Sequence, residues 1–407
     1  MHGNSSACGA DARVKLLDYR LVAPGVCIVA TSYGLARYAY GLFLPVFREV
    51  FDLSDRLLAL TAAASYASYF LITLAGIYLS TRVGPRLSVL LGGLAAALGM
   101  ALIAGATAPW MLILGVTVAG VSPGLAYTPF SEIIVTLVTA PRRKGIYSVI
   151  NSGTSLGVML SGPVAILLGE SWRMAWAIFA GFGLLSTLWC VAILPPVAAR
   201  NAGGFGQLDW RWMTTGGRGR LFAVAFLIGI ATSIYWAFSV DLVTAGRTTI
   251  VLAGHRLDPA TFGQVFWSLV GLAGFAGAFA GRIVGRIGPI RSLAVFQAGI
   301  AVATLMLAAG QGPVAVLGSG LVFGGFFVFM AATLGMWSLD LSAEAPAVGF
   351  GLTFLLLSAG QFVGPMLVGL MIGWVPLPAL FVLAGGASLA VLALLPRRSV
   401  PALAEGA

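Results

Sequence analysis

Arg37 is the residue whose type and position most directly indicate chemistry. It lies well inside an apolar segment that runs from residue 21 to residue 47. An arginine at the centre of a membrane helix costs about 2.5–3.5 kcal/mol, so such residues normally face a water-filled cavity or a partner. At helical spacing Tyr33, Arg37 and Tyr40 share one face. This pattern predicts a site for a carboxylate or phosphate flanked by two phenols; a snorkelling or internally paired structural arginine is the alternative.

Two carboxylates within apolar segments are candidates for proton coupling. Asp241 lies late in the segment 221–243, and Glu132 lies near one end of the segment 110–137. A buried carboxylate takes up a proton more readily because burial disfavours its charged form. Asp241 is alternatively a partner of Arg37 or a hydrated residue at the membrane boundary. For Glu132 the alternatives are hydration and pairing with the basic residues that follow its segment.

Uncharged side chains inside the apolar segments complete the predicted substrate site. Amides can hydrogen-bond an organic substrate or join neighbouring helices, and aromatic rings can line an apolar cavity or simply pack. We predict substrate contacts for three amides and two aromatic residues: Asn151, Gln264, Gln361, Tyr235 and Phe238. Packing between helices is the alternative interpretation for each of them.

The composition shows which environment must position these residues. Only 9% of the 407 residues are charged, 59% are hydrophobic, and the mean hydropathy is +0.99. An ordinary soluble domain has about 25% charged residues. So few charges cannot cover the surface of a soluble protein of this length, which excludes soluble, disordered and nucleic-acid-binding classes. The net charge of +10 is therefore expected to reflect membrane topology.

The apolar residues group into twelve segments, each long enough to cross a bilayer, which takes roughly 20 residues. With the N-terminus inside, 17 of the 23 Lys and Arg residues fall on the cytoplasmic side and five fall outside. This asymmetry predicts a multi-pass protein of the bacterial inner membrane with both termini cytoplasmic. The predicted spans are 21–47, 57–79, 87–106, 110–137, 147–168, 173–194, 221–243, 262–280, 292–310, 313–337, 348–372 and 376–395.

A stretch rich in Gly, Arg and Asn near mid-chain divides the predicted spans into two sets of six. We expect an N-terminal half at 1–194, a cytoplasmic central loop at 195–220 and a C-terminal half at 221–407. The two halves also resemble each other at offsets of 201 to 204 residues. A common offset indicates a duplicated six-helix unit. The matching segments are Thr81–Leu90 with Gly285–Val295, Ala30–Ser32 with Ala231–Ser233, and Gly162–Pro163 with Gly364–Pro365.

These features together resemble the major facilitator superfamily, and the segment Arg37–Tyr40 is similar to a poorly characterised bacterial branch of it. The resemblance implies an all-α membrane fold with two pseudo-symmetric six-helix bundles and secondary transport by alternating access. Thr81 and Gly285 stand where the family signature has Asp, so its charge-relay latch is not expected. The resemblance also implies loops that change conformation, formed by the signature residues Arg82, Gly84 and Arg86 and by Gly281, Arg286 and Gly288.

We therefore expect a secondary transporter for a small organic solute, anionic or amphiphilic, that works by proton-coupled efflux. Gly157, Gly162 and Pro163 loosely resemble the family's exporter signature. A proton-coupled uptake symporter is the near alternative, and a membrane sensor or enzyme on the same scaffold is the second class.

Other chemistry lacks the residues that it needs. The chain has two histidines and three scattered cysteines, which give no metal-ligand spacing. It has no Gly-Lys-Ser/Thr phosphate loop, so an ATP-driven pump is not supported. We expect no enzymatic activity, no cofactor, no metal and no nucleic-acid partner. The expected partners are a small-molecule substrate, protons and the lipid bilayer, and the expected state is a monomer.

Overall fold

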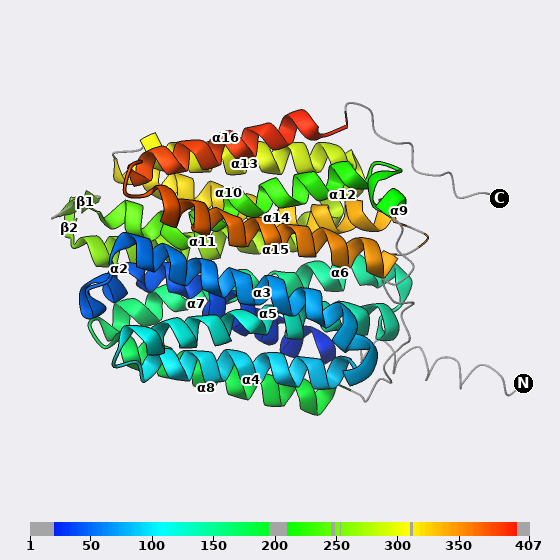
Figure 1. The fold of residues 1–407 in the computed structure, drawn as a ribbon, viewed down its shortest axis with the longest axis horizontal. Helices are drawn as coiled ribbons and strands as arrows, with labels where there is room; N and C mark the ends of the chain where they lie inside the picture. Colours follow the sequence, from blue (N-terminus) through cyan, green and yellow to red (C-terminus); the bar gives the residue numbers. More distant parts are fainter. Residues whose placement is uncertain are drawn as a thin grey trace, which may run out of the picture.

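The chain folds into a bundle of long helices that run in nearly the same direction (Figure 1). The computed structural model describes residues 20–194, 210–245, 249–252, 254–309, 312–342, 344 and 346–396. Within these residues, twelve helices are long and apolar enough to cross a membrane. They coincide with the twelve predicted spans, and the predicted all-α membrane fold is confirmed.

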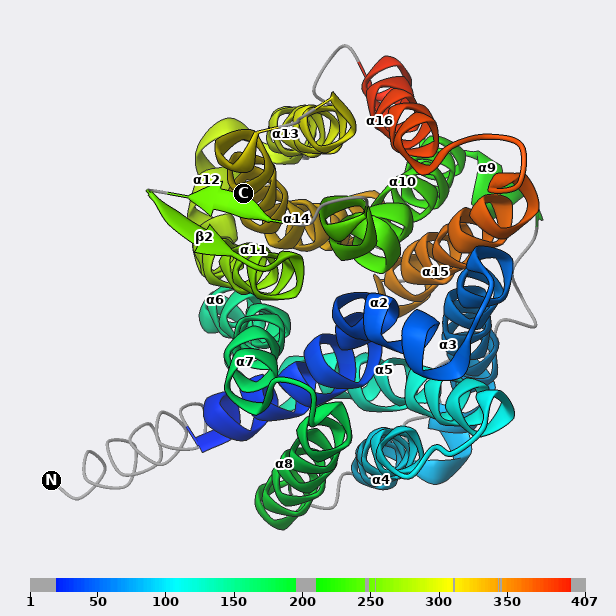
Figure 2. The same cartoon turned by 90° about the vertical axis from the view of Figure 1, so that its left-hand side faces the viewer.

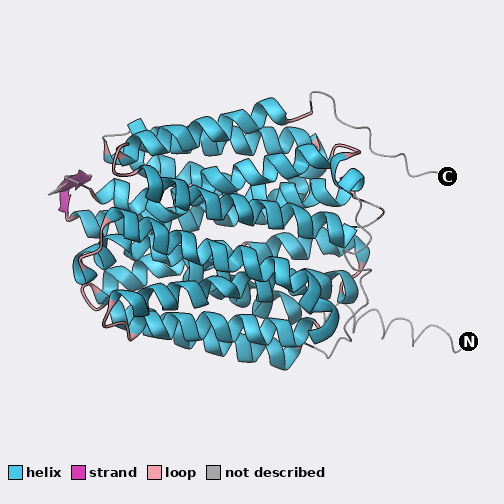
Figure 3. Ribbon diagram, viewed as in Figure 1, coloured by secondary structure: helices cyan, strands magenta, loops and turns pink. Residues whose placement is uncertain are grey.

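The first span is one helix from Arg20 to Phe51, which includes a π-helical segment, η1. Helices dominate the described structure, and its one sheet is a hairpin of two short strands that the sequence did not indicate (Figure 3). The elements are η1 (Ala30–Tyr38), α2 (Ala39–Phe51), α3 (Asp55–Val83), α4 (Pro85–Ala104), α5 (Pro109–Leu137), α6 (Ala140–Asn151), α7 (Gly153–Leu168), α8 (Trp172–Ile193), α9 (Trp210–Thr214), α10 (Arg218–Thr244), β1 (Ile250–Leu252), β2 (His255–Leu257), α11 (Pro259–Gly274), η3 (Phe275–Phe279), α12 (Ala280–Ile287), α13 (Pro289–Ala309), α14 (Pro313–Leu341), α15 (Pro346–Met371) and α16 (Leu377–Leu394).

The described helices form two groups, the first from residues 20–194 and the second from residues 210–396. Helices within each group pack mainly against one another, and the two groups lie one above the other in Figure 2. Three pairs of helices make the main contacts between the groups: α3 with α15, α7 with α11, and α2 with α10. We call the end of the bundle that carries β1 and β2 the hairpin end, and the opposite end, which carries α9, the α9 end (Figure 1).

Two Gly-Pro joints at the α9 end turn one membrane helix into the next. Gly84 separates α3 from α4 with a φ of 77°, and Gly288 separates α12 from α13 with a φ of 82°. Positive φ favours glycine because a Cβ would collide with the backbone. Pro85 and Pro289 follow as the first helical residues, where the fixed φ of proline suits a helix. The sequence match between these segments thus corresponds to one backbone conformation used twice.

The start of the second group is fixed by Arg218, which is 8% exposed. Its Nε donates to the backbone oxygen of Trp212 on α9 at 2.6 Å, and its Nη1 donates to Glu344 at 2.5 Å. The indole nitrogen of Trp212 also donates to Glu344, at 3.0 Å. Hydrogen bonds from its own backbone amide and from Trp212, together with the charge of Arg218, lower the pKa of Glu344. Part of the predicted central loop is therefore ordered, while residues 195–209 lie outside the described residues.

Glycines bring helices to backbone contact within each group. A Cβ on Gly157 of α7 would collide with the carbonyl oxygen of Ala30 and the Cα of Gly34. A Cβ on Gly360 of α15 would collide with the carbonyl oxygen of Phe226 on α10. Close backbone approach matters because apolar burial gives helices in lipid no net drive to associate. The first and fifth spans are thus joined in the same way as the seventh and eleventh.

We predict that Gly157→Ala lowers the unfolding temperature of the detergent-purified protein, because overpacking costs about 1–3 kcal/mol. Gly181→Ala is the matched control, since a Cβ there has no atom within 4 Å in the described structure. The measurement is thermal unfolding followed by intrinsic fluorescence. Equal unfolding temperatures for Gly157→Ala and Gly181→Ala would contradict the close packing of η1 on α7.

Candidate functional site

Arg37 lies inside the bundle with 3% of its surface exposed. Four tyrosine rings surround its guanidinium carbon, at 4.1 Å for Tyr69, 4.4 Å for Tyr66, 5.4 Å for Tyr38 and 5.7 Å for Tyr33, measured to the ring centres. A cation over an aromatic face gains about 2 kcal/mol or more when both are shielded from water. These four residues, which we call the tyrosine cage, stabilise a charge that the bilayer interior disfavours.

Hydrogen bonds satisfy the guanidinium of Arg37 only in part. Its Nη2 donates to the side-chain oxygen of Gln361 on α15 at 2.7 Å. Its Nε and Nη1 are buried and have no hydrogen-bond partner in the described part of the chain. Gln361 carries no charge, and a buried charge is costly unless it is paired. The arrangement therefore offers a positive charge and two donors to an anion.

The π-helical segment η1 sets which residues surround Arg37. In a π-helix the hydrogen bonds run from residue i to residue i+5, and Tyr33 and Tyr38 accordingly lie side by side with ring centres 6.1 Å apart. The prediction that Tyr40 shares the face of Tyr33 and Arg37 assumed α-helical spacing and is wrong. The hydroxyl of Tyr40 instead donates to the backbone oxygen of Leu58, at 3.0 Å. Tyr38 takes the place predicted for Tyr40.

A cavity of about 30 Å³ lies beside the tyrosine cage, which is room for about two water molecules. Its lining comes from both groups of helices and includes Gln361, the partner of Arg37. Half of the twelve lining residues are aromatic: Tyr33, Tyr38, Tyr69, Tyr127, Phe327 and Phe354. Apolar walls with a few convergent polar groups are typical of ligand sites, which usually measure about 300–1,000 Å³, so the cavity is narrow in this conformation.

A second polar cluster borders the same cavity and carries no charge. The hydroxyl of Tyr127 donates to the side-chain oxygen of Asn151 at 3.1 Å and hydrogen-bonds the hydroxyl of Tyr147. We call these three residues the amide-phenol cluster. Tyr127 and Asn151 line the cavity. The ring of Tyr127 meets the ring of Tyr33 edge-on at 5.4 Å, so the cluster lies next to the tyrosine cage.

Three of the predicted substrate contacts lie away from the cavity. Tyr235 is buried among aromatic rings of the second group, and Phe238 is buried but does not line the cavity. Gln264 lies where α11 packs against α7. The reason is helix rotation, which short polar or aromatic patterns do not reveal. The neighbouring Trp236 faces the tyrosine cage instead, and its ring stacks on Tyr38 at 4.2 Å.

Tyr66, Tyr69 and Tyr127 were not predicted from the sequence, although they surround Arg37 or line the cavity. One sequence feature could have identified two of them. Tyr66 and Tyr69 are three residues apart and therefore share a helix face, in the middle of a span where a phenol needs a partner. The hydroxyl of Tyr69 lies 3.1 Å from the hydroxyl of Tyr33.

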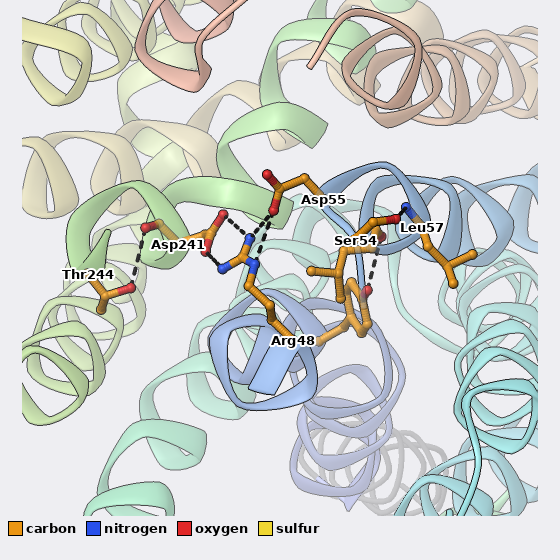
Figure 4. Close-up of polar contacts among 8 residues, drawn as sticks. Arg48, Ser54, Asp55, Leu57, Asp241 and Thr244 are labelled. Atoms are coloured by element: carbon orange, nitrogen blue, oxygen red, sulfur yellow. Dashed lines mark hydrogen bonds and ion pairs between the residues drawn. The ribbon is translucent and has the colours of Figure 1, made fainter. Parts of the chain in front are cut away.

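Asp241 pairs with Arg48, so the predicted alternative of a pair with Arg37 is wrong (Figure 4). Arg48 binds both carboxylate oxygens of Asp241, one of them at 2.8 Å, and also donates to Asp55 at 2.9 and 3.1 Å. Asp241 is 5% exposed. Arg48 and Asp55 belong to the first group of helices, whereas Asp241 belongs to the second. This charge cluster (Arg48, Asp55 and Asp241) therefore ties the two groups together at the hairpin end.

Further contacts join the same helices between the charge cluster and the cavity. Gly41 on α2 faces the backbone oxygen of Trp236 on α10 so closely that a Cβ would collide with it. Next along these helices comes the stack of Tyr38 on Trp236. The first and seventh spans are thus in contact from Asp241 to the edge of the cavity.

The residues predicted for moving loops lie at the α9 end. Arg86 donates from Nε to the backbone oxygen of Val191 at 3.1 Å. Their role in a conformational change stays a prediction. The side chains of Glu132 on α5 and Arg82 on α3 lie outside the described residues. The other predicted loop residues are Gly84 and Gly288, which form the joints described above, and Gly281 and Arg286, which lie on α12.

Comparisons with known proteins agree with this architecture. The profile of the Major Facilitator Superfamily matches residues 26–357. A segment of 130 residues is 33% identical to Monocarboxylate transporter 12-B of Danio rerio, a match that spans 31% of this chain and only 27% of that protein. The crystal structure of a mutant of the nucleoside transporter NupG has a TM-score of 0.67 at 15% identity, over 93% of this chain and 98% of that chain. At this identity the likeness shows the fold alone.

The π-helical register predicts different accessibility for two neighbouring tyrosines. In a background with all native cysteines replaced, we expect Tyr38→Cys to react with a small water-soluble maleimide, because residue 38 lines the cavity. Tyr40→Cys should stay unreactive, since residue 40 packs toward α3. The rates can be measured by mass spectrometry of the labelled protein. Faster labelling at residue 40 than at residue 38 would show that the α-helical register is the correct one.

Proposed function

The chain belongs to the Major Facilitator Superfamily, and from this premise we propose that it is a secondary active transporter for a small organic anion. Alternating access of a site near the middle of the membrane is how transporters of this kind work. The observation that carries the proposal is Arg37, a buried cation with a neutral hydrogen-bond partner and two donors without one.

Charge balance supports an anion over a neutral or cationic solute. A guanidinium binds carboxylate or phosphate through charge-assisted hydrogen bonds, and Arg37 has two nitrogens, Nε and Nη1, that are without a partner in the described part of the chain. The bound pair is neutral overall and is therefore less costly in the bilayer interior than the charge of Arg37 alone. The similarity of one segment to a monocarboxylate transporter is consistent with this substrate class.

The contacts at the hairpin end support a mechanism in which the two groups of helices rock against each other. The charge cluster, the Gly41 contact and the Tyr38–Trp236 stack hold α2 against α10. Access from the hairpin end requires these contacts to break. All three are local contacts between two rigid helices, so they can break and re-form as a unit while the helices themselves stay intact.

Asp241 is the proposed proton carrier. When the groups separate at the hairpin end, Arg48 keeps Asp55, which belongs to its own group, whereas Asp241 loses its partner. A carboxylate that leaves an ion pair binds a proton more readily. Opening and protonation of Asp241 are thereby linked. Glu132 remains a second proposed carrier on the sequence argument.

The finer assignments follow the sequence. We place the protein in the bacterial inner membrane with both termini cytoplasmic, because Lys and Arg residues concentrate on that side of the predicted topology. Efflux is preferred to uptake because Gly157, Gly162 and Pro163 resemble an exporter signature. The two six-helix halves would move as a monomer, without enzymatic activity.

Replacing Arg37 tests the anion site. We predict that Arg37→Ala weakens binding of the best carboxylate in a panel of sodium acetate, pyruvate, hexanoate and benzoate by about 10- to 100-fold, the usual worth of hydrogen bonds to a charged group. Arg37→Lys should retain part of the affinity. Arg173→Ala is the control, since Arg173 donates to the backbone oxygen of Ala106 away from the cavity. Thermal stabilisation of the purified protein gives the affinities, and equal affinity in Arg37→Ala and wild type would rule the anion site out.

Replacing Asp241 tests the coupling. In proteoliposomes, Asp241→Asn should keep exchange of the same carboxylate across the membrane but lose accumulation driven by a proton gradient. Asp55→Asn should keep both, because its side chain is 55% exposed and its loss leaves the pair of Arg48 with Asp241 intact. Addition of an uncoupler should abolish accumulation by the wild type. Gradient-driven accumulation by Asp241→Asn would assign the proton to another group.

A further inference from the structure

The cavity has two polar sides of different character, and this difference narrows the substrate class. Resting on the proposed function, we propose that the transported anion carries one negative charge on an aromatic body with a hydroxyl or carbonyl group opposite the charge. The carboxylate lies at Arg37, the ring lies among the aromatic side chains, and the neutral polar group lies at the amide-phenol cluster. This ligand is larger than the cavity of about 30 Å³, so it binds when the two groups of helices separate and widen the cavity.

The side of the cavity at Gln361 lies next to a single cation, Arg37, which is not itself among the lining residues. Gln361, which lines the cavity, holds one guanidinium nitrogen of Arg37 and leaves two others without a partner. Among the described residues that line the cavity, none is charged. A second carboxylate on the ligand would thus be buried without a partner, which costs far more than a buried neutral group. Dianions are therefore excluded.

The neutral side offers hydrogen bonds without charge. Asn151 accepts a hydrogen bond from Tyr127, so the side-chain NH2 of Asn151 is the donor left for a ligand. Thr154, one turn further along the chain, also lines the cavity and brings a hydroxyl. A site built to hydrogen-bond a ligand hydroxyl discriminates strongly against ligands that lack it, because its own polar groups are then left unpaired.

The walls between the two sides favour a flat ring. Tyr33 contacts both sides, with Arg37 at 5.7 Å and the ring of Tyr127 at 5.4 Å from its ring centre. A single aromatic ring thus separates the charged side from the neutral side. Phe327 and Phe354 line the cavity from the second group of helices. Aromatic side chains prefer stacked or edge-on contacts with other rings, which favour a ring in the ligand over an aliphatic chain.

The experiment compares five probes on the full-length purified protein by thermal stabilisation. The probes are 4-hydroxybenzoate, benzoate, hexanoate, terephthalate and the methyl ester of 4-hydroxybenzoate. We expect 4-hydroxybenzoate to bind more tightly than benzoate by about 2- to 12-fold, the range of one net hydrogen bond, and benzoate more tightly than hexanoate. Terephthalate and the uncharged ester should bind at least about 10-fold more weakly than 4-hydroxybenzoate.

Two variants locate the neutral group. Asn151→Ala and Tyr127→Phe should each reduce the affinity for 4-hydroxybenzoate by a larger factor than the affinity for benzoate, and the remaining binding of benzoate shows that the variants fold. Gln264→Ala is the matched control, because this amide lies outside the cavity lining. It should change neither affinity.

The outcomes separate this inference from the proposed function. Carboxylate binding that depends on Arg37 supports the anion transporter. The proposed substrate class is then overturned by any one of three results: equal affinities for hexanoate and benzoate, equal affinities for terephthalate and 4-hydroxybenzoate, or an Asn151→Ala variant that affects both benzoates alike. If no carboxylate binds in a manner that depends on Arg37, both are overturned.

Discussion

The buried charge of Arg37 is the constraint on which the site depends. A guanidinium at 3% exposure cannot rely on water, so its surroundings must supply both attraction and hydrogen bonds. The tyrosine cage supplies the attraction through ring faces, which stabilise a cation without neutralising it. A carboxylate in place of one tyrosine would satisfy Arg37 permanently and remove its affinity for an anion. The choice of phenols over carboxylates therefore keeps the site available.

The π-helical segment explains how so many rings reach one guanidinium. Its wider turn brings Tyr33 and Tyr38, five residues apart, to the same side of the first span. Tyr38 can then contact Arg37 on one face and stack on Trp236 of the second group on the other. The π-helical segment η1 thus links the charged site to the interface between the two groups of helices. Such π-helical turns are frequent at functional sites.

The twelve spans and the burial of Arg37 could be predicted from the sequence, because each depends on a strong signal within one short segment. A charge inside an apolar segment, or twenty apolar residues in a row, is visible without knowledge of any neighbour. The sequence could not show which face of each helix points to the cavity, since nearly every face of these helices is apolar. This explains why Gln361 and Asn151 line the cavity while Gln264, chosen by the same pattern, does not. It also explains why an assumed α-helical register misplaced Tyr40. The partner of Asp241 was missed because Arg48 looked like an ordinary boundary residue.

The hydrogen bond from Arg37 to Gln361 also connects ligand binding to the movement of helices. Arg37 belongs to the first span and Gln361 to the eleventh, so their bond is a contact between the two groups. An anion that binds the guanidinium competes with the neutral amide oxygen for Nη2 and prevails, since the attraction between opposite charges adds to the hydrogen bond. Binding then weakens one contact between the groups at the site itself. The contacts of Arg48 with Asp241 and of Tyr38 with Trp236 lie on the same pair of helices, so an anion at Arg37 acts on the interface that has to open.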